Sequence, residues 1–175
     1  VPAFADCQRL AQAALDAFGR IDVLDCNAGI CVLGDFLTEG DSWRDSHIVI
    51  NVKGVWNACK AVTPAVIDAG GGAIVITSSV TGDMVADPGE VAYATTKAAL
   101  IGFTKALARE LAPKNIRVNC ICPGYIRTPL VDGMAEQSDP ENPERAIDAI
   151  AAAVPLGRLG TPQGCGELCA FLASD

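Results

Sequence analysis

Tyr93 and Lys97 are the two residues whose types and spacing could most directly move a proton. Four positions apart on a helix, they share one face, so the ammonium lies beside the phenol. A tyrosine with an ordinary pKa near ~10 is a poor base at neutral pH, and a neighbouring positive charge lowers that pKa. The pair therefore predicts general acid/base chemistry on an alcohol. By itself, a tyrosine four residues before a lysine can also be an ordinary pair of surface residues on a helix.

The elements that must position this pair form an alternating pattern. Three short apolar runs, at residues 21–26, 73–77 and 116–122, are typical of strands buried on both faces of a parallel sheet. Helical patterns long enough for crossovers separate and precede them, at residues 3–18, 52–69 and 93–112. The alternation predicts one α/β domain over residues 1–175, a doubly wound parallel sheet in three α/β/α layers.

The pattern loosens after the third run. Residues 124–141 hold Gly, Pro, Asp and Ser with little periodicity, and we expect a mobile loop there. Two shorter helices are expected at residues 144–153 and 162–173. The glycine-rich stretch from Gly160 to Gly166 is no phosphate-binding turn, because Thr161 and the proline after it indicate an N-cap and first helical position.

Each predicted strand ends in a turn of small or polar residues. Asn27, Ala28 and Gly29 follow the first run, Ser78 and Ser79 follow the second, and Pro123 and Gly124 follow the third. Ligands bind at the carboxyl ends of parallel strands, so these turns predict a single crevice. A serine hydroxyl there could bind a reacting oxygen, although a serine pair after a strand is more often a turn residue or helix cap.

Together these motifs resemble the short-chain dehydrogenase/reductase family, in its form with one Rossmann domain. The motifs in chain order are Cys26-Asn27-Ala28-Gly29, Asn51, Ser79, Tyr93-x-x-x-Lys97 and Pro123-Gly124. The resemblance runs from Val1 to Asp175, and residues 74–98 are especially similar to the bacterial UcpA-like oxidoreductases. Cys26 departs from the family pattern, which has asparagine there, but keeps the small turn.

The resemblance implies a role for each catalytic position. Tyr93 would be the general acid/base, and Lys97 would lower its pKa and hold the nicotinamide ribose. Ser79 would orient the substrate oxygen. Asn51 would kink its helix and hold a water that joins Lys97 to solvent. From its position before Val52 alone, Asn51 could equally be a helix N-cap.

The family resemblance also implies NAD or NADP as cofactor and a secondary alcohol or ketone as substrate. The residues that would contact the cofactor are Asn27, Ala28, Gly29, Tyr93, Lys97, Pro123, Gly124, Ile126 and Thr128. It further implies a homodimer or homotetramer that pairs through the helices at 52–69 and 93–112.

Composition excludes several other classes of function. A net charge of −8 makes nucleic acid or an anionic membrane surface an unsuitable partner, and we expect a cytoplasmic protein. The eight cysteines are expected to be reduced packing thiols, with no metal site. His47 is the only histidine and is expected to be a polar residue on a helix, because no G-x-S-x-G elbow accompanies it for a hydrolase.

The family begins with a strand, a glycine-rich turn and a helix whose N-terminus holds the pyrophosphate. Val1 already corresponds to the segment entering a later helix, and Asp175 precedes the family's last strand. We therefore interpret the chain as a fragment that lacks the first strand–turn–helix. The intact catalytic set favours an active oxidoreductase as the full-length protein, whereas the missing phosphate site argues against activity of this chain by itself. The alternatives are a catalytically silent remnant that serves as an assembly or binding module, and an epimerase or dehydratase of the extended branch, which would need a longer C-terminal domain.

Overall fold

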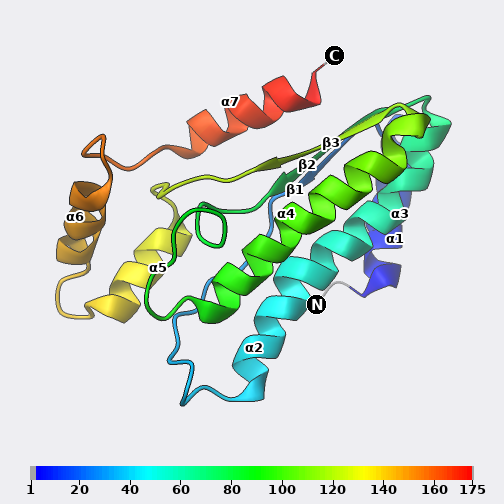
Figure 1. Cartoon of the computed structure of the whole chain (residues 1–175). Coiled ribbons are helices and arrows are strands. Elements are labelled where there is room, and N and C mark those ends of the chain that lie inside the picture. Colours follow the sequence, from blue (N-terminus) through cyan, green and yellow to red (C-terminus); the bar gives the residue numbers. More distant parts are fainter. Residues whose placement is uncertain (1–2, 175) are drawn as a thin grey trace.

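The computed structural model describes residues 3–174, and within them a three-stranded parallel sheet forms the centre (Figure 1). The strands are β1 (Val23–Cys26), β2 (Gly72–Thr77) and β3 (Ile116–Ile121), in the spatial order β1-β2-β3. Leu24 pairs with Ile74, which in turn pairs with Val118. The predicted strands and the central place of the middle one are confirmed. Val1 and Asp175, between which the family resemblance was expected to run, lie outside the described residues.

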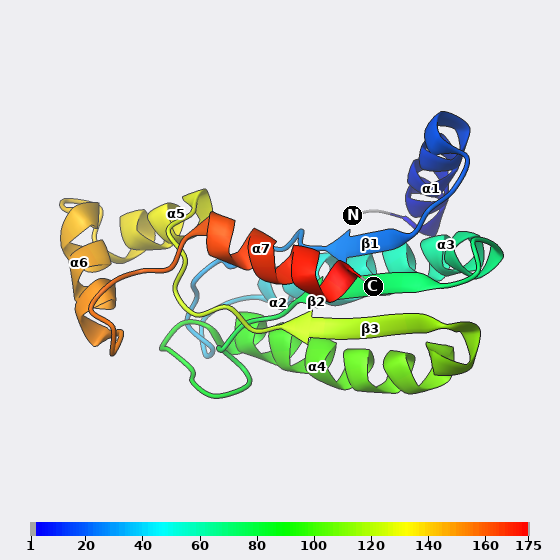
Figure 2. The ribbon, with the colours of Figure 1, turned by 90° about the horizontal axis from the view of Figure 1, so that it is seen from above.

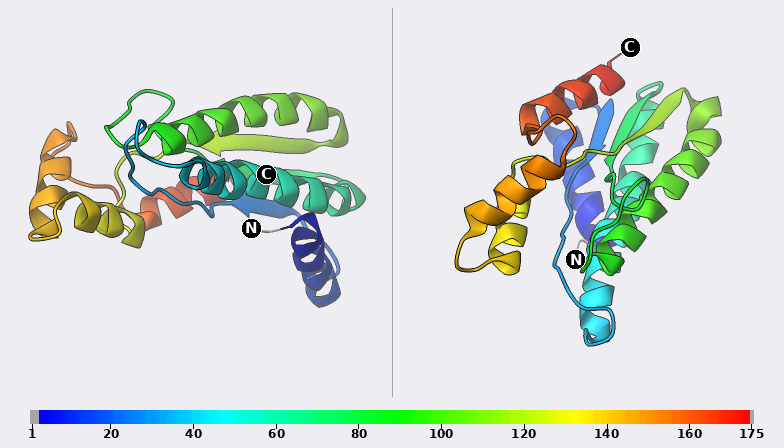
Figure 3. Two further views of the ribbon diagram at one scale, coloured as in Figure 1. Left: turned by 90° about the horizontal axis from the view of Figure 1, so that it is seen from below. Right: turned by 60° about the vertical axis from the view of Figure 1, so that its left-hand side comes forward.

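Helices cover both faces of this sheet, which confirms the doubly wound, Rossmann-like fold. α3 (Gly54–Asp68) and α4 (Val91–Leu111) lie against one face, and α7 (Pro162–Ala173) crosses the other (Figures 1 and 3). α1 (Phe4–Phe18) packs on α3 beyond the edge of the sheet and ends at Gly19, which has the left-handed conformation expected of a helix stop.

The core lies between the sheet and the α3–α4 layer. Ile74 and Ile76 of β2 are fully buried there against Val66 of α3 and Leu100 of α4. Ala73 and Val75, whose side chains point to the other face of β2, are buried as well, so β2 has no solvent-facing side. This explains why β2 is apolar throughout instead of alternating apolar and polar residues.

Two further helices escaped the sequence analysis. α2 (Asp41–His47) continues through a π-helical segment (Ile48–Lys53) into α3, so Asn51 lies inside a helix and its interpretation as an N-cap is wrong. α5 (Pro129–Ser138) occupies the stretch that was expected to be a mobile loop, and that expectation is also wrong. Proline suits the first helical position, and the two buried residues of α5, Val131 and Ala135, lie one turn apart.

α5 and α6 (Pro143–Ala153) form a pair beyond the carboxyl ends of the strands. In Figure 2 the arrowheads of the strands point toward this pair. Arg127, in the connection after β3, joins the two helices through Asp132 at 2.8 Å and Glu144 at 3.0 Å. The pair thus stands over the end of the sheet where ligands bind in folds of this class.

Two glycines allow a matched test of how the segment after β2 is held. Gly82 has a φ of +91°, and a side chain on it would meet the Ala94 carbonyl oxygen of α4. Gly102 lies within α4 with open space around it. We expect Gly82→Ala to lower the free energy of unfolding by about 2–4 kcal/mol through backbone strain and overpacking. Gly102→Ala should raise it by about 0.5–1 kcal/mol, because alanine is the better helix former.

Chemical denaturation of both variants beside the unchanged chain measures this difference. Equal effects of the two substitutions would contradict the tight fit of Gly82 against α4.

Candidate active site

The start of α4 presents Tyr93 and Lys97 to the carboxyl end of β2. The Lys97 Nζ lies 5.5 Å from the centre of the Tyr93 ring and donates a hydrogen bond to the Thr77 carbonyl oxygen at 2.9 Å. The Lys97 carbonyl oxygen accepts a hydrogen bond from the Ser78 hydroxyl at 2.7 Å. These two contacts fix α4 to the end of the central strand. The Ser78 hydroxyl is therefore already engaged in a structural hydrogen bond.

Ser79 is the serine that faces the phenol. Its hydroxyl oxygen accepts a hydrogen bond from the Thr81 backbone N–H at 3.1 Å, and its hydrogen bonding to Tyr93 lowers the pKa of that phenol. The sequence interval between Ser79 and Tyr93 is taken up by a turned segment, in which a β-bridge joins Thr81 to Val85. The structure therefore brings together Ser79, Tyr93 and Lys97 as the sequence predicted.

Burial dominates the electrostatics of this pair. It raises the pKa of Tyr93 to about 12, an effect larger than the lowering by the Ser79 hydroxyl. It also lowers the pKa of Lys97 below its ordinary value. Burial favours the uncharged form of each group, and the lowering of the Tyr93 pKa expected from Lys97 stays a prediction.

Asn51 lies behind the site, in the π-helical segment. Its Oδ1 accepts a hydrogen bond from the Ile30 N–H at 2.8 Å, and its Nδ2 donates to the Ile30 carbonyl oxygen at 2.9 Å and to the Thr96 hydroxyl at 3.0 Å. A wider π turn is a common feature of functional sites in helices. Here the side chain holds the segment after β1 against α4, which carries Tyr93.

His47 holds the same segment one turn earlier. Its Nε2 accepts a hydrogen bond from the Val32 N–H at 3.1 Å, and its Nδ1 lies 2.8 Å from the Trp43 carbonyl oxygen. The Trp43 indole N–H in turn donates to the Val32 carbonyl oxygen at 2.9 Å. The histidine lies on a helix as expected, but it is completely buried, and both ring nitrogens are used in structural contacts.

One cavity of about 540 Å³ lies at the carboxyl ends of the strands. Ten predicted site residues line it: Asn27, Ala28, Gly29, Ser79, Tyr93, Lys97, Pro123, Gly124, Ile126 and Thr128. Asn51 is buried outside the lining. α5 and α7 also contribute to the wall, through Val131 and Met134 of α5 and Cys165 and Cys169 of α7.

The lining residues that the sequence analysis missed include two titratable ones, Glu90 and Tyr125. Glu90, the residue before α4, is buried, and burial raises the pKa of its carboxyl. Tyr125 hydrogen-bonds through its hydroxyl to Asp87, and burial raises the pKa of this phenol too. A glutamate just before a helix is a common N-terminal residue, so its type and position alone do not indicate a buried site.

The cysteines are all free, as expected, and the thiols of Cys26 and Cys59 lie 3.9 Å apart in the core. Among residues 3–174, no three His, Cys, Asp or Glu side chains come together as a metal site requires. No helix in the same part of the chain is both long and apolar enough to cross a membrane.

The chain is similar to known oxidoreductases in sequence and in structure. A family model described as enoyl-(acyl carrier protein) reductase matches residues 1–175. The oxidoreductase UcpA of Salmonella typhimurium is 56% identical over 172 residues, which cover 98% of this chain and 65% of that protein. The chain therefore spans somewhat less than two thirds of the length of this relative. The similarity to UcpA-like oxidoreductases is confirmed.

Two solved structures with bound cofactors are also similar. An NAD⁺-bound xylitol dehydrogenase superposes with a TM-score of 0.90 at 30% identity, over 99% of this chain and 70% of that one. ElxO with NADP bound superposes with a TM-score of 0.86 at 30% identity, over 98% of this chain and 67% of that one.

The Asn51 network can be tested through its partner in α4. Thr96→Val keeps the shape of the side chain but removes the acceptor for the Asn51 Nδ2. We expect a loss of about 1–3 kcal/mol in the free energy of unfolding, because a buried amide hydrogen is left unpaired. Thr95→Val is the matched control, since the Thr95 hydroxyl also bonds a carbonyl of its own helix but is exposed. Urea titration of both variants measures the free energy of unfolding. Thr95→Val should change it by no more than about 0.5 kcal/mol.

The Tyr93 pKa can be followed directly, because the chain has only two tyrosines. In a Tyr125→Phe variant, phenolate absorbance should titrate with a midpoint at about 12. Because the pKa of Tyr93 is higher in the folded chain than the unfolded value of ~10, the uncharged phenol stabilises the folded state. This contribution is fully present below pH ~10 and is lost as the pH rises through the folded pKa. Circular dichroism at each pH confirms that the chain is folded. A folded-state midpoint at or below ~10 would refute the dominance of burial.

Proposed function

Because this chain belongs to the short-chain dehydrogenase/reductase family, we propose that it acts as an oxidoreductase that transfers hydride between NAD or NADP and a secondary alcohol or ketone. The observation that supports this most directly is the convergence of Ser79, Tyr93 and Lys97 on one cavity at the carboxyl ends of the strands. The bound cofactors of the two similar structures agree with the choice of cofactor.

The cavity fits the nicotinamide end of such a cofactor. The Lys97 ammonium has three N–H donors and spends one on Thr77, so two remain for ribose hydroxyls. Gly29 leaves room beside it, because a Cβ there would lie 3.4 Å from the Lys97 Nζ and 3.2 Å from the Asn51 Oδ1. The segment Asn27–Gly29 would border the ribose. The turn after β3, with Pro123, Gly124, Ile126 and Thr128, would hold the nicotinamide.

In this proposal each side chain has one task. When bound, the nicotinamide supplies or accepts the hydride. Ser79 donates a hydrogen bond to the reacting oxygen and orients it toward Tyr93. Tyr93 donates its proton to that oxygen as a ketone is reduced and removes it as an alcohol is oxidised. With a pKa of about 12 the phenol is protonated at neutral pH, which suits the reductive direction.

Oxidation requires a lower Tyr93 pKa than the chain alone provides. The Lys97 ammonium, 5.5 Å from the ring centre, is the cationic side chain that favours the phenolate. Asn51 acts as a positioning residue, because it touches the segment after β1 and α4 but does not line the cavity. The water that the family resemblance places with Asn51, joining Lys97 to solvent, is part of the same proposal.

We also propose that the protein is a homodimer or homotetramer that pairs through α3 and α4. Trp56 of α3 is 55% exposed and stacks against Phe103 of α4, with ring centres 5.0 Å apart. This aromatic pair adds apolar area to the outward surface of the two helices, and closed symmetric pairing would remove it from water.

The acid/base role predicts the effect of one deleted hydroxyl. In the full-length protein, Tyr93→Phe should reduce kcat by about 10²–10⁴-fold, the usual contribution of a positioned acid or base, with a smaller change in cofactor affinity. Lys97→Ala should impair both turnover and cofactor binding. Steady-state kinetics and calorimetry with NADH and NADPH measure the two quantities. Near-normal turnover in the Phe variant would rule out this role for Tyr93.

The assembly predicts a change in mass when the aromatic pair is disrupted. Light scattering at micromolar concentration should show a dimer or tetramer, and Trp56→Glu should shift the protein to smaller species. Phe171→Glu is the control, because Phe171 is 73% exposed on α7, on the opposite side of the sheet. A monomer at this concentration, or equal effects of the two substitutions, would contradict assembly through α3 and α4.

A further inference from the structure

The α5–α6 pair contributes one wall of the cavity but has little contact with the rest of the fold. The two helices pack on each other, and among the described residues neither has more than marginal contact with another helix or strand. Arg145 of α6 strengthens the pair by bonding Asp139, the residue after α5, at 2.7 Å. In Figure 1 the pair stands apart from α3, α4 and the sheet. Its place at the cavity therefore depends on a few bonds at its edge.

The wall that α5 contributes has an apolar inner side. Its lining residues are Pro129, Leu130, Val131 and Met134. Asp132, which lies among them in the sequence, does not line the cavity, and its side chain is partly exposed. The turn after β3 has the same arrangement, because Ile126 and Thr128 line the cavity whereas Arg127 between them does not. Arg127 and Asp132 therefore lie on the outer side of a wall whose inner side faces the cavity.

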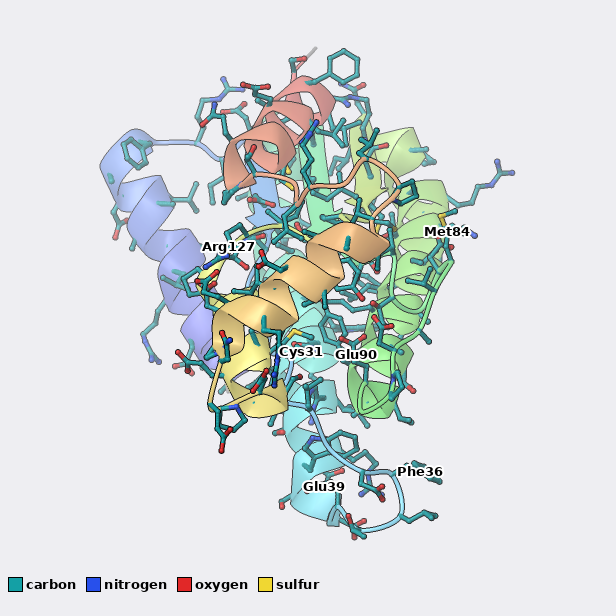
Figure 4. The ribbon with its side chains drawn as sticks, turned by 90° about the vertical axis from the view of Figure 1, so that its left-hand side faces the viewer. Cys31, Phe36, Glu39, Met84, Glu90 and Arg127 are labelled. Carbon is teal, nitrogen blue, oxygen red and sulfur yellow. The ribbon has the colours of Figure 1, made fainter. Side chains whose placement is uncertain are left out.

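Arg127 is held through both its backbone and its guanidinium. Its backbone N–H donates a hydrogen bond to the Gly160 carbonyl oxygen at 3.1 Å. Its Nε lies 2.8 Å from the Asp132 Oδ1 of α5, and its Nη2 lies 3.0 Å from the Glu144 Oε1 of α6. Figure 4 shows Arg127 beside these two helices, away from the outer segment that carries Phe36. One planar side chain thus ties the turn after β3 to both helices.

The charge of Arg127 compensates a carboxylate oxygen of α5. The Asp132 Oδ1 is buried, and it finds no hydrogen-bond donor among the described residues besides the guanidinium of Arg127. A buried carboxylate oxygen that loses its cation is costly. The guanidinium also lowers the pKa of the Glu144 carboxyl. Ion pairs near a surface contribute little to the stability of a whole domain, but here the interaction acts on two helices with few other contacts and so sets their position.

A second tie joins α5 to the segment after β1. The Leu33 N–H donates a hydrogen bond to the Gln137 Oε1 at 3.2 Å. This bond carries no net charge, so salt screens the Arg127 tie and leaves this one in place. Screening by salt therefore separates the contribution of Arg127 from that of the other contacts of α5.

We propose that Arg127 is a positioning residue for the substrate, because it holds the apolar inner side of α5 against the part of the substrate beyond the reacting oxygen. This inference rests on the proposed oxidoreductase function of the same cavity. Arg127 does not line the cavity itself and acts through Asp132 and Glu144. α5 offers no charged lining residue, so the part of the substrate that it contacts is apolar. Loss of Arg127 should therefore weaken substrate binding more than it slows the chemical step.

Two readouts on the full-length protein test this. The first is amide hydrogen exchange of residues 129–153 by mass spectrometry, which needs no ligand. The second is the affinity for cyclohexanone, an apolar ketone, measured as KM with NADH or NADPH and as Kd by saturation-transfer NMR. The variants are Arg127→Gln, which removes the charge, and Arg127→Lys, which keeps the charge without the planar guanidinium. Arg20→Gln is the matched control, because Arg20 pairs with Asp22 at 2.6 Å in a partly exposed ion pair at the opposite end of β1.

In Arg127→Gln we expect exchange in α5 and α6 to be about 3–10-fold faster, and KM and Kd for cyclohexanone to rise by about the same factor. Exchange in α3 and α4 should not change, and kcat should change by less than about twofold. Sodium chloride at about 1 M should move the unchanged protein toward the variant, because it screens the ion pair. Arg127→Lys should recover part of the loss, and Arg20→Gln should match the unchanged protein. If Arg127→Gln fails to fold, the salt dependence of the unchanged protein decides the test.

The outcomes separate the two proposals. Equal exchange in Arg127→Gln and Arg20→Gln, or faster exchange with unchanged KM and Kd, would overturn the positioning role and leave the oxidoreductase function standing. Failure of the unchanged protein to bind cyclohexanone would overturn the apolar contact with α5. Binding of cyclohexanone that weakens in Arg127→Gln, without turnover in any of the proteins, would support the role of Arg127 and count against the oxidoreductase function.

Discussion

One side-chain amide, that of Asn51, holds the two halves of the site in register. It closes both hydrogen bonds of the Ile30 backbone and reaches the Thr96 hydroxyl in α4. A buried amide is fully satisfied only when all its partners are in place, so any shift of one segment leaves polar groups unpaired in the core. The segment after β1 and the start of α4 are therefore positioned by the same group. The π-helical segment is what brings this amide inward, since it interrupts the regular spacing of a helix that is otherwise continuous from Asp41 to Asp68.

Burial sets the chemistry of the cavity more strongly than the pairing of charges does. It raises the pKa of Tyr93 and of Glu90 and lowers that of Lys97, so each group is driven toward its neutral form. Such a cluster is typical of functional sites, because small changes in the surroundings then decide which group is charged. A ligand that excludes the remaining water and supplies a donor or a charge changes all three groups at once.

The fold was largely predictable from the sequence because its strands are buried on both faces. β2 has no polar residue between Ala73 and Ile76, and a short apolar run of this kind between helical patterns is typical of a central parallel strand. α2 was missed for the opposite reason. Its sequence is polar almost throughout, and it is held by hydrogen bonds of Trp43 and His47 to the Val32 backbone, which leave no apolar periodicity to detect. α5 was missed because the glycine and prolines around it indicate a loop, while its contact with the rest of the chain depends on only a few buried positions such as Val131 and Ala135.

The site residues also differ in how far local sequence patterns indicate them. The positions of Tyr93, Lys97 and Ser79 could be predicted from helical spacing and from the end of a strand, and the family resemblance implied their roles. Glu90 could not, because its burial is decided by tertiary contacts. Gly89 takes a φ of +85° and its carbonyl oxygen accepts a hydrogen bond from the Gly34 N–H, which brings the segment after β1 across the start of α4. A common first-turn acid thereby becomes a buried one. The surroundings of the catalytic pair thus depend on how two loops pack over the start of α4, which no local sequence pattern indicates.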